Sequence, residues 1–211
     1  MKQVLLLTPT QEGKLDVFYT ASLAETIRVG IANNIEFIPQ FIAYDALVQR
    51  VRNDLLKIAY QSGLDTIWID DDMGWDPMWL VKMVNRPEDI IAAPVRKKTD
   101  EAEIYNVLTQ PQINITDDLL LVESVGFGLI KLSKEAIKQL WASGEPYVEN
   151  GVDKSWAFDV RIENGVLVSE DIIACRAIGL PIYVDITMNP THTGTKTWRG
   201  SFCKGGFGNA V

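Results

Sequence analysis

Three consecutive aspartates, Asp70, Asp71 and Asp72, have the type and spacing that most directly indicate chemistry in this sequence. They follow residues 66–69, a short apolar run with the composition of a buried strand. Because side chains alternate along a strand, Asp70 and Asp72 are predicted to face one way and Asp71 the other. Two carboxylates on one face suit a hydrated divalent cation that also holds a phosphate-bearing substrate. The alternative is a solvated acidic turn, but repulsion among three carboxylates favours a bound cation.

His192, the only histidine, is the candidate third ligand for that cation. An imidazole joins carboxylates around a transition metal, and manganese accepts this mixture of ligands. A histidine in a surface loop without any ligand role is the alternative. The sequence therefore predicts a site for Mn²⁺ or Mg²⁺ formed by Asp70, Asp72 and His192.

Several cations could face a phosphate group. Arg52 flanks the apolar stripe of a predicted helix, from where it either reaches a phosphate or base or packs its aliphatic stem. The same helical wheel places Asn53 on the opposite face and gives it no role. Further cations beside a pyrophosphate would neutralise leaving-group charge, although such clusters are often merely solvated. They are Arg96, Lys97, Lys98, Lys196, Arg199 and Lys204.

Glu170 and Asp171 are the candidates for proton transfer. They follow Ser169 at the predicted start of a helix. A positioned carboxylate there would act as general base on an acceptor hydroxyl. Acidic residues in a first helical turn are also favoured by the helix dipole alone, so both interpretations stay open.

The elements that must position these residues alternate in type. Apolar runs predict strands at 4–7, 35–43, 66–69, 90–94, 119–123, 126–132 and 182–185, and helical periodicity predicts helices at 16–33, 45–62, 78–84, 133–143 and 169–179. Asp45 is the expected cap of the second helix and Gly63 its end. This order predicts a parallel sheet with helices on its faces, with ligands at the carboxyl ends of its strands. Residues 100–118 look like an excursion or a hairpin, and residues 189–211 look irregular.

Composition narrows the class of protein. The 211 residues are most simply one domain, and a net charge of −8 makes a general affinity for nucleic-acid phosphate unexpected. Cys175 and Cys203 are too few for a disulfide framework. With no run of the ~18 apolar residues that a membrane span needs and no signal peptide, we expect a cytoplasmic protein without a membrane span.

Taken together, these segments resemble the GT-A glycosyltransferases, the nucleotide-sugar-dependent class with an Asp-x-Asp metal motif. The similar segments occur in the family's order at residues 7–10, 51–54, 64–73, 90–98, 125–131, 169–171, 182–185 and 191–194. Phe127 departs from the pattern, because it stands where the family has a small polar residue between two glycines. The resemblance implies an α/β GT-A fold: a Rossmann-like, mostly parallel central sheet with flanking helices and a mixed C-terminal half. It implies one domain over 1–211, with a nucleotide-sugar half at 1–100, an acceptor half at 101–188 and a lid or tail at 189–211.

The resemblance also implies an activity and roles. The chain would be a hexosyl- or pentosyltransferase that moves a sugar from a nucleotide-diphosphate sugar, with UDP favoured, to an acceptor hydroxyl. Asp171 would be the base, with Glu170 as second choice. Asp70, Asp72 and His192 would hold Mn²⁺ or Mg²⁺, and Asp70 would also contact the ribose. The nucleotide-sugar site would comprise Thr8, Pro9, Thr10, Arg52, Asp70, Asp71, Lys98 and Lys196, with Lys196 or Arg199 closing over it.

The acceptor and two rival classes stay open. The sequence is similar to compact bacteriophage or bacterial members, so candidate acceptors are a hydroxymethylated pyrimidine in phage DNA, a glycan, a glycolipid head and a protein hydroxyl. Trp156 and Phe158 are either a stacking platform for the acceptor or core residues. The alternatives are a non-catalytic nucleotide-sugar-binding module and a haloacid-dehalogenase-type phosphatase, in which Gly-Thr or Gly-Val would follow the Asp-x-Asp. A sugar-phosphate nucleotidyltransferase would need a glycine-rich basic loop after the first strand, and residues 8–14 are not one.

Overall fold

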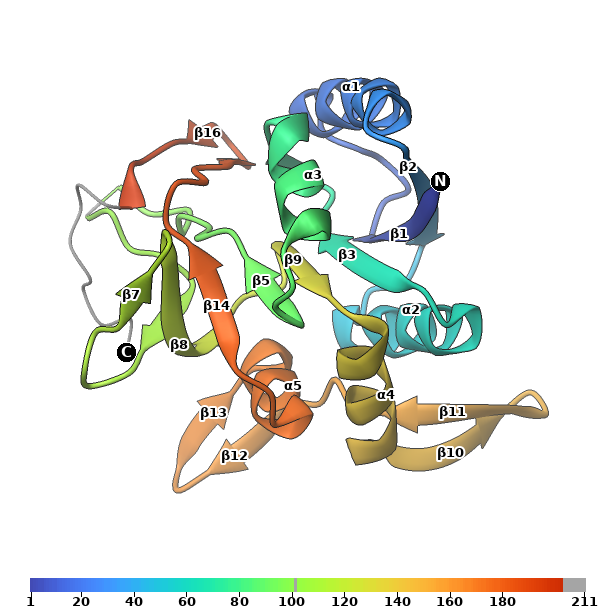
Figure 1. Cartoon of the computed structure of the whole chain (residues 1–211). Coiled ribbons are helices and arrows are strands. Elements are labelled where there is room, and N and C mark those ends of the chain that lie inside the picture. The colour runs from blue at the N-terminus through green and yellow to red at the C-terminus, as the bar shows by residue number, and fades with distance from the viewer. Residues whose placement is uncertain (101, 203–211) are drawn as a thin grey trace.

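A mixed sheet forms the centre of the protein, for which a computed structural model describes residues 1–100 and 102–202 (Figure 1). Nine strands build it, in the order β2-β1-β3-β9-β5-β14-β8-β6, with β7 also paired to β8. Their bounds are β1 Lys2–Thr10, β2 Ile35–Ala43, β3 Asp65–Ile69, β5 Ile90–Ala92, β6 Val107–Thr109, β7 Ile115–Thr116, β8 Leu119–Val125, β9 Leu129–Leu132 and β14 Ile182–Asp185. Only β9 and β8 run against the other strands of this sheet. The expected α/β class with a mostly parallel central sheet is confirmed.

Helices cover both faces of this sheet (Figure 1). Helices α1 (Val17–Ala32) and α3 (Pro77–Asn85) pack on one face, and α2 (Val48–Ser62), α4 (Lys134–Ser143) and α5 (Glu170–Ile178) on the other. Strand β1 shows why two layers are needed: Val4 and Leu6 enter the core under α1 and α3, whereas Leu5 and Leu7 enter the core under α2, α4 and α5. A strand buried on both faces is a nearly continuous apolar run, as residues 4–7 are.

Local signals set most helix ends where the sequence predicts them. Asp16 accepts a hydrogen bond from the Phe18 N–H at 2.7 Å at the start of α1, and Ser133 caps α4 in the same way. Gly63 and Gly179 take the left-handed conformation that ends α2 and α5.

The expected cap of α2 is wrong. Asp45 accepts a hydrogen bond from the Leu47 N–H at 2.9 Å and pairs with Arg50, so it orders the turn before the helix. The helix itself begins at Val48, and its N-cap residue, Leu47, makes no side-chain capping bond. A cap side chain must reach the first turn of its helix, and Asp45 lies too early in the chain to do so.

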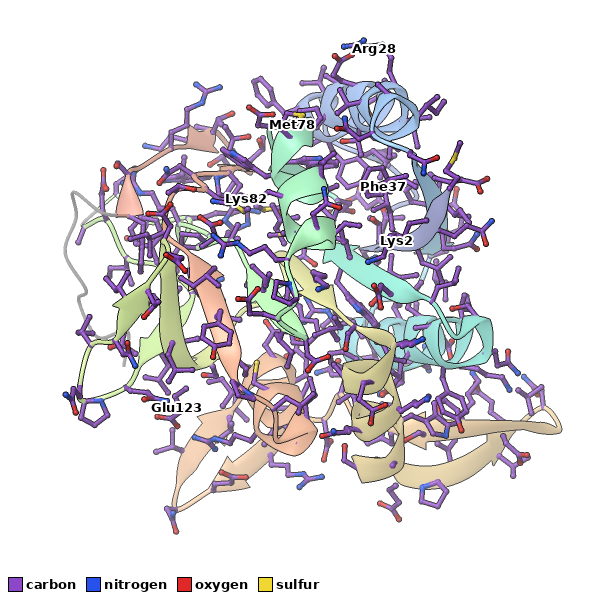
Figure 2. The ribbon with its side chains drawn as sticks, in the orientation of Figure 1. Lys2, Arg28, Phe37, Met78, Lys82 and Glu123 are labelled. Carbon is purple, nitrogen blue, oxygen red and sulfur yellow. The ribbon has the colours of Figure 1, made fainter. Side chains whose placement is uncertain are left out.

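Ion pairs and hydrogen bonds fix α3 to the sheet. Lys82 reaches from α3 to Asp185 of β14, at 2.6 Å, and Asp185 is fully buried. Lys2 of β1 donates to the Val84 carbonyl and pairs with Asp65, both at 3.0 Å. Both lysines are labelled in Figure 2. These contacts join α3 to β1 and β14.

The second half of the chain differs from the prediction in its local detail. The strand expected at 126–132 is shorter, because residues 126–128 form the turn between β8 and β9. The stretch at 100–118, predicted as an excursion or a hairpin, contains β6 and β7, which each pair with β8 and extend the sheet. Two hairpins project beside α4 and α5, β10 (Glu145–Glu149) with β11 (Val152–Trp156) and β12 (Arg161–Glu163) with β13 (Val166–Val168) (Figure 1).

A small second sheet joins the segment after the aspartates to the C-terminal segment. It contains β4 (Met73–Gly74), β15 (Thr191–Thr193) and β16 (Thr197–Trp198), so part of the expected irregular lid is regular structure. An added Cβ at Gly74 would lie 2.5 Å from Thr191 Oγ1 and 2.8 Å from Phe18 Cβ, so the close strand approach requires glycine here. The rest of the predicted lid, residues 203–211 with Cys203 and Lys204, lies outside the described residues.

No helix within residues 1–100 and 102–202 is long and apolar enough to cross a membrane.

Candidate functional site

The three aspartates lie in a turn rather than along a strand. Strand β3 ends at Ile69, and the Met73 N–H donates to the Asp70 carbonyl at 3.2 Å, which closes a four-residue turn. The expected alternation of side chains is therefore wrong, because it holds only while the backbone stays extended. All three aspartates line one pocket.

This aspartate pocket, of about 240 Å³, lies at the carboxyl ends of β1 and β3, where open α/β sheets bind ligands. Its lining includes most of the predicted nucleotide-sugar residues, namely Pro9, Thr10, Arg52, Asp70 and Asp71, together with Gln11, Asp45, Ala46, Val48, Val51 and Asp72. Thr8 does not line it. Its side chain is fully buried, with Oγ1 2.5 Å from the Tyr19 hydroxyl of α1, because Thr8 shares the face of β1 that carries Val4 and Leu6.

Arg52 lies at the centre of a cluster of carboxylates. It is 4% exposed, and its guanidinium contacts Asp70 at 3.1 Å, Glu170 at 3.0 Å and Asp171. One positive charge therefore faces three negative ones. The guanidinium also lies over Phe127, 5.6 Å from the ring centre, so the residue that departs from the GT-A pattern packs against Arg52.

Burial raises the pKa of Asp171 to about 6. Arg52 opposes this rise, while the neighbouring charges of Glu170 and Asp70 add to it. A carboxylate with this pKa is ionised at neutral pH and is a stronger base than an ordinary aspartate, which is what general base catalysis requires.

Asn53 is a residue to which the helical wheel gave no role, and that interpretation is wrong. The side chain is fully buried; Oδ1 accepts from the Ala157 and Phe158 N–H groups and Nδ2 donates to the Phe158 carbonyl, all at 2.9 Å. It thus fixes the loop that places the Phe158 ring 6.0 Å from the Arg52 guanidinium. The wheel shows no sign of this role because the partners lie more than 100 residues later.

A second pocket lies on the other side of the Arg52 cluster. This α5 pocket, of about 350 Å³, lies between the start of α5 and strands β6 and β8. It is lined by Lys97, Asn106, Val107, Leu108, Ser124, Val125, Gly126, Ser169, Glu170, Asp171 and Ile172. Glu170 and Asp171 line it and also bind Arg52, which lines the aspartate pocket. The buried ion cluster therefore separates the two pockets.

His192 and Asp72 come together as the sequence predicts. The backbone of β15 reaches the aspartate turn directly, because the Thr193 N–H donates to the Asp72 carbonyl at 2.9 Å. His192 Nδ1 lies 2.7 Å from the Arg96 carbonyl oxygen, which only accepts, so Nδ1 carries the proton. In the neutral ring, Nε2 then has a free lone pair, and it lies 3.5 Å from Asp72 Oδ1.

This pair of atoms fits a metal ion. Asp72 Oδ1 is buried and has no hydrogen-bond partner, and two ligands each about 2.1 Å from one cation lie about 3 Å apart when adjacent. A histidine whose other nitrogen donates to a carbonyl is the usual arrangement of a metal ligand. Burial raises the pKa of Asp72, but Lys98 and the protonated form of His192 outweigh it and hold that pKa below its usual value, so Asp72 is ionised. A metal ion would take the place of the Nε2 proton of that form.

The third predicted ligand, Asp70, is placed differently. Its Oδ1 contacts Arg52, and within the described residues no group of three or more His, Cys, Asp and Glu side chains is arranged to hold a metal. Asp72 and His192 are thus the two residues whose donor atoms meet, and the full set of Asp70, Asp72 and His192 stays a prediction.

The remaining predicted residues lie at various distances from the two pockets. Lys98 pairs with Asp72, which lines the aspartate pocket, but is not itself among the lining residues. Lys196 pairs with Asp100 at 2.5 Å and is not among the residues that line either pocket. The Arg199 guanidinium lies over the Phe18 ring, 5.4 Å from its centre.

The aromatic pair does not form a platform. Phe158 is fully buried and packs against Trp68 and Phe127, with ring centres 5.3 and 5.0 Å apart. Trp156 donates from Nε1 to Asp159 at 2.9 Å and lines neither pocket. Phe158 is therefore a core residue, which was the alternative interpretation.

Comparisons with known proteins give a fold and no family. No model of a known protein family matches the sequence, and no curated protein matches it. The structure is similar to that of A197 from STIV, at 13% identity and a TM-score of 0.57, over 92% of this chain and 86% of that one. This likeness shows a shared fold. Two weaker matches, too low in TM-score to establish a common fold, are a glycosyltransferase involved in the glycosylation of the major capsid of PBCV-1 (TM-score 0.35, 10% identity, 65% of each chain) and an apo UDP-glucose pyrophosphorylase (0.44, 10%, 95% and 76%).

Proposed function

We propose that this chain is a metal-dependent glycosyltransferase that moves a sugar from a nucleotide-diphosphate sugar, with UDP favoured, to an acceptor hydroxyl. One observation carries the proposal: two pockets share a wall, and that wall contains Arg52 and the carboxylates of Asp70, Glu170 and Asp171. A transferase needs a donor site and an acceptor site next to each other, and two pockets with a common wall meet that requirement.

The donor fits the aspartate pocket only with a cation. The pocket lining carries four carboxylates, those of Asp45, Asp70, Asp71 and Asp72, and one arginine, so a diphosphate alone would be repelled. Asp72 and His192 are the residues that would hold Mn²⁺ or Mg²⁺, which when bound neutralises charge on the departing diphosphate. The end of β1 provides Pro9 and Thr10, and the start of α2 provides Val48 and Val51, as walls for the nucleoside.

The acceptor enters from the α5 pocket in this proposal. Asp171 takes the proton of the acceptor hydroxyl as the hydroxyl oxygen bonds to the anomeric carbon of the sugar, and the nucleotide diphosphate leaves. Its raised pKa of about 6 supports this role. Glu170, which lines the same pocket, is the second candidate.

The test is a melting-temperature screen with UDP-, GDP- and CMP-sugars, with and without Mn²⁺. A ligand present at 100 times its Kd stabilises the folded state by about 2.7 kcal/mol. We expect a UDP-sugar to raise the melting temperature of the wild type only with Mn²⁺, and Asp72→Ala to abolish this rise. The matched control is Asp153→Ala, at an exposed aspartate outside the aspartate pocket.

Equal UDP affinity for Asp72→Ala and the wild type would refute the metal assignment. UDP-sugar binding that is independent of Mn²⁺, with no transfer to any acceptor, would instead identify a non-catalytic binding module.

A further inference from the structure

The α5 pocket contains polar side chains that no other described residue satisfies. Asn106, Ser124, Ser169 and Lys97 line it, and none of their side chains hydrogen-bonds to another part of the described chain. Ser124 is only 1% exposed. Because Ser124 lines the pocket, a ligand there can supply the hydrogen-bond partner that the described residues do not.

The chemistry of the lining selects the ligand class. Carboxylates, hydroxyls and one amide in the lining provide many hydrogen-bond acceptors, and Val107, Leu108, Val125 and Ile172 provide apolar surface. A saccharide matches both parts of this lining, because its hydroxyl groups donate and accept hydrogen bonds and its C–H faces pack on apolar side chains. At about 350 Å³ the pocket is near the small end of ligand sites, about 300 to 1,000 Å³, so only the terminal part of a glycan would enter.

A DNA base fits the same pocket poorly. Enzymes that act on a base extrude it and stack it on aromatic or apolar side chains, and nucleic-acid affinity depends on cations at the phosphates. Among the described residues that line the α5 pocket none is aromatic, and Lys97 is the one cation in a lining that also holds the carboxylates of Glu170 and Asp171. The net charge of −8 opposes a nucleic acid further.

From these observations we infer that the acceptor is a neutral saccharide bound in the α5 pocket, with Asn106 and Ser124 hydrogen-bonding its hydroxyl groups. The role of the saccharide as acceptor rests on the proposed function, whereas its binding in the α5 pocket does not. Gly126 makes room for the recognising amide, since an added Cβ there would lie 3.0 Å from Asn106 Cβ and 3.3 Å from Nδ2.

Saturation-transfer NMR without nucleotide tests the binding directly. The probes are the methyl glycosides of glucose and galactose, maltose, and a duplex oligonucleotide that contains 5-hydroxymethylcytosine. We expect at least one neutral saccharide to bind the wild type, and Asn106→Ala and Ser124→Ala each to weaken it by about tenfold, the equivalent of one lost hydrogen bond. Asn85→Ala, at an exposed asparagine that ends α3, is the matched control and should bind as the wild type does.

UDP binding with Mn²⁺, measured in parallel, separates the two proposals. Saccharide binding without any UDP binding would refute the proposed function and leave the pocket assignment standing. UDP binding without saccharide binding, or glycosyl transfer to the oligonucleotide alone, would overturn the inference about the acceptor. Asn106→Ala weakening UDP and saccharide equally would also overturn it, because the α5 pocket would then belong to the donor site.

Discussion

Replacing Asp171 by asparagine tests whether the protein keeps this carboxylate ionised at the expense of stability. Asparagine preserves the shape of the side chain and removes its charge and its proton affinity. Asp171 has a pKa of about 6 in the folded protein, raised by burial, against the ordinary value of 3.8. The folded state therefore holds this proton more tightly than the unfolded state does.

The size of the effect follows from that difference. The whole difference between a pKa of about 6 in the folded protein and 3.8 in the unfolded chain corresponds to about 3 kcal/mol of stability. This stability is present below pH 3.8 and is lost as the pH rises through about 6. Between pH 5 and pH 7.5 the loss amounts to about 1 kcal/mol. In Asp171→Asn the side chain at this position does not titrate, so the unfolding free energy of the variant does not fall for this reason as the pH rises.

The assay is urea unfolding of the wild type and Asp171→Asn at pH 5, 6 and 7.5, with chelator present to exclude metal. We expect the difference in unfolding free energy between the two proteins to change by about 1 kcal/mol in favour of the variant as the pH rises. Asp153→Asn, at an exposed aspartate, is the control and should follow the wild type. Sugar transfer by Asp171→Asn should fall by a factor of about 100 to 10,000, while donor binding persists.

A difference that stays constant from pH 5 to pH 7.5 would refute the raised pKa. Transfer at nearly the wild-type rate would refute the role of Asp171 as base, whatever the stability data show. Asp70, Glu170 and Asp171 share Arg52, so a fall in activity at low pH reports protonation of the whole cluster rather than of one carboxylate. Loss of this pH dependence in Asp171→Asn would assign it to Asp171.

Three further substitutions test the framework of the site. Arg52→Met should lower the unfolding free energy by about 3 to 5 kcal/mol at pH 7.5, and by less at pH 5, because unpaired carboxylates regain protons there; an equal loss at both pH values would contradict the cluster. Asn53→Ala should cost about 3 kcal/mol in urea unfolding, since it leaves buried backbone groups at the Phe158 loop unpaired, and a loss below about 1 kcal/mol would show that this loop is held otherwise. Gly74→Ala should abolish the Mn²⁺-dependent affinity for UDP measured by calorimetry, because its Cβ forces Thr191 and the adjacent His192 away from the aspartate turn; wild-type affinity would separate His192 from metal binding.

Sequence patterns predicted those helices and strands whose ends are determined by residues within or next to the segment. The helix at 16–33 was predicted within one residue at each end because its cap and its periodicity lie within the segment itself. The strands at 35–43 and 182–185 match β2 and β14. Strand β9 shows the limit: its position between β3 and β5, against their direction, depends on pairing with strands about 40 to 65 residues earlier.

The errors at the site have one physical origin. The alternation argument for the aspartates fails because a turn begins at Asp70, and the Asp70–Met73 hydrogen bond that closes it leaves no periodic trace. Thr8 was expected in the nucleotide pocket, but the pleat of β1 turns it toward Tyr19 of α1. In both cases, which way a side chain faces depends on the exact residue at which an extended strand begins or ends.

The sequence by itself determined the chemical nature of the site: three adjacent carboxylates after a buried strand, a lone histidine, and a pair of acidic residues at a helix start. These are properties of residue type and short-range order. Only the tertiary structure decided that Arg52 would bind Asp70, Glu170 and Asp171 at once, since Glu170 lies 118 residues further along the chain. It also decided that this cluster would separate two pockets, and that His192 Nε2 would face Asp72. Such juxtapositions arise from the pairing order of the sheet and the packing of α2 against it, which no local pattern encodes.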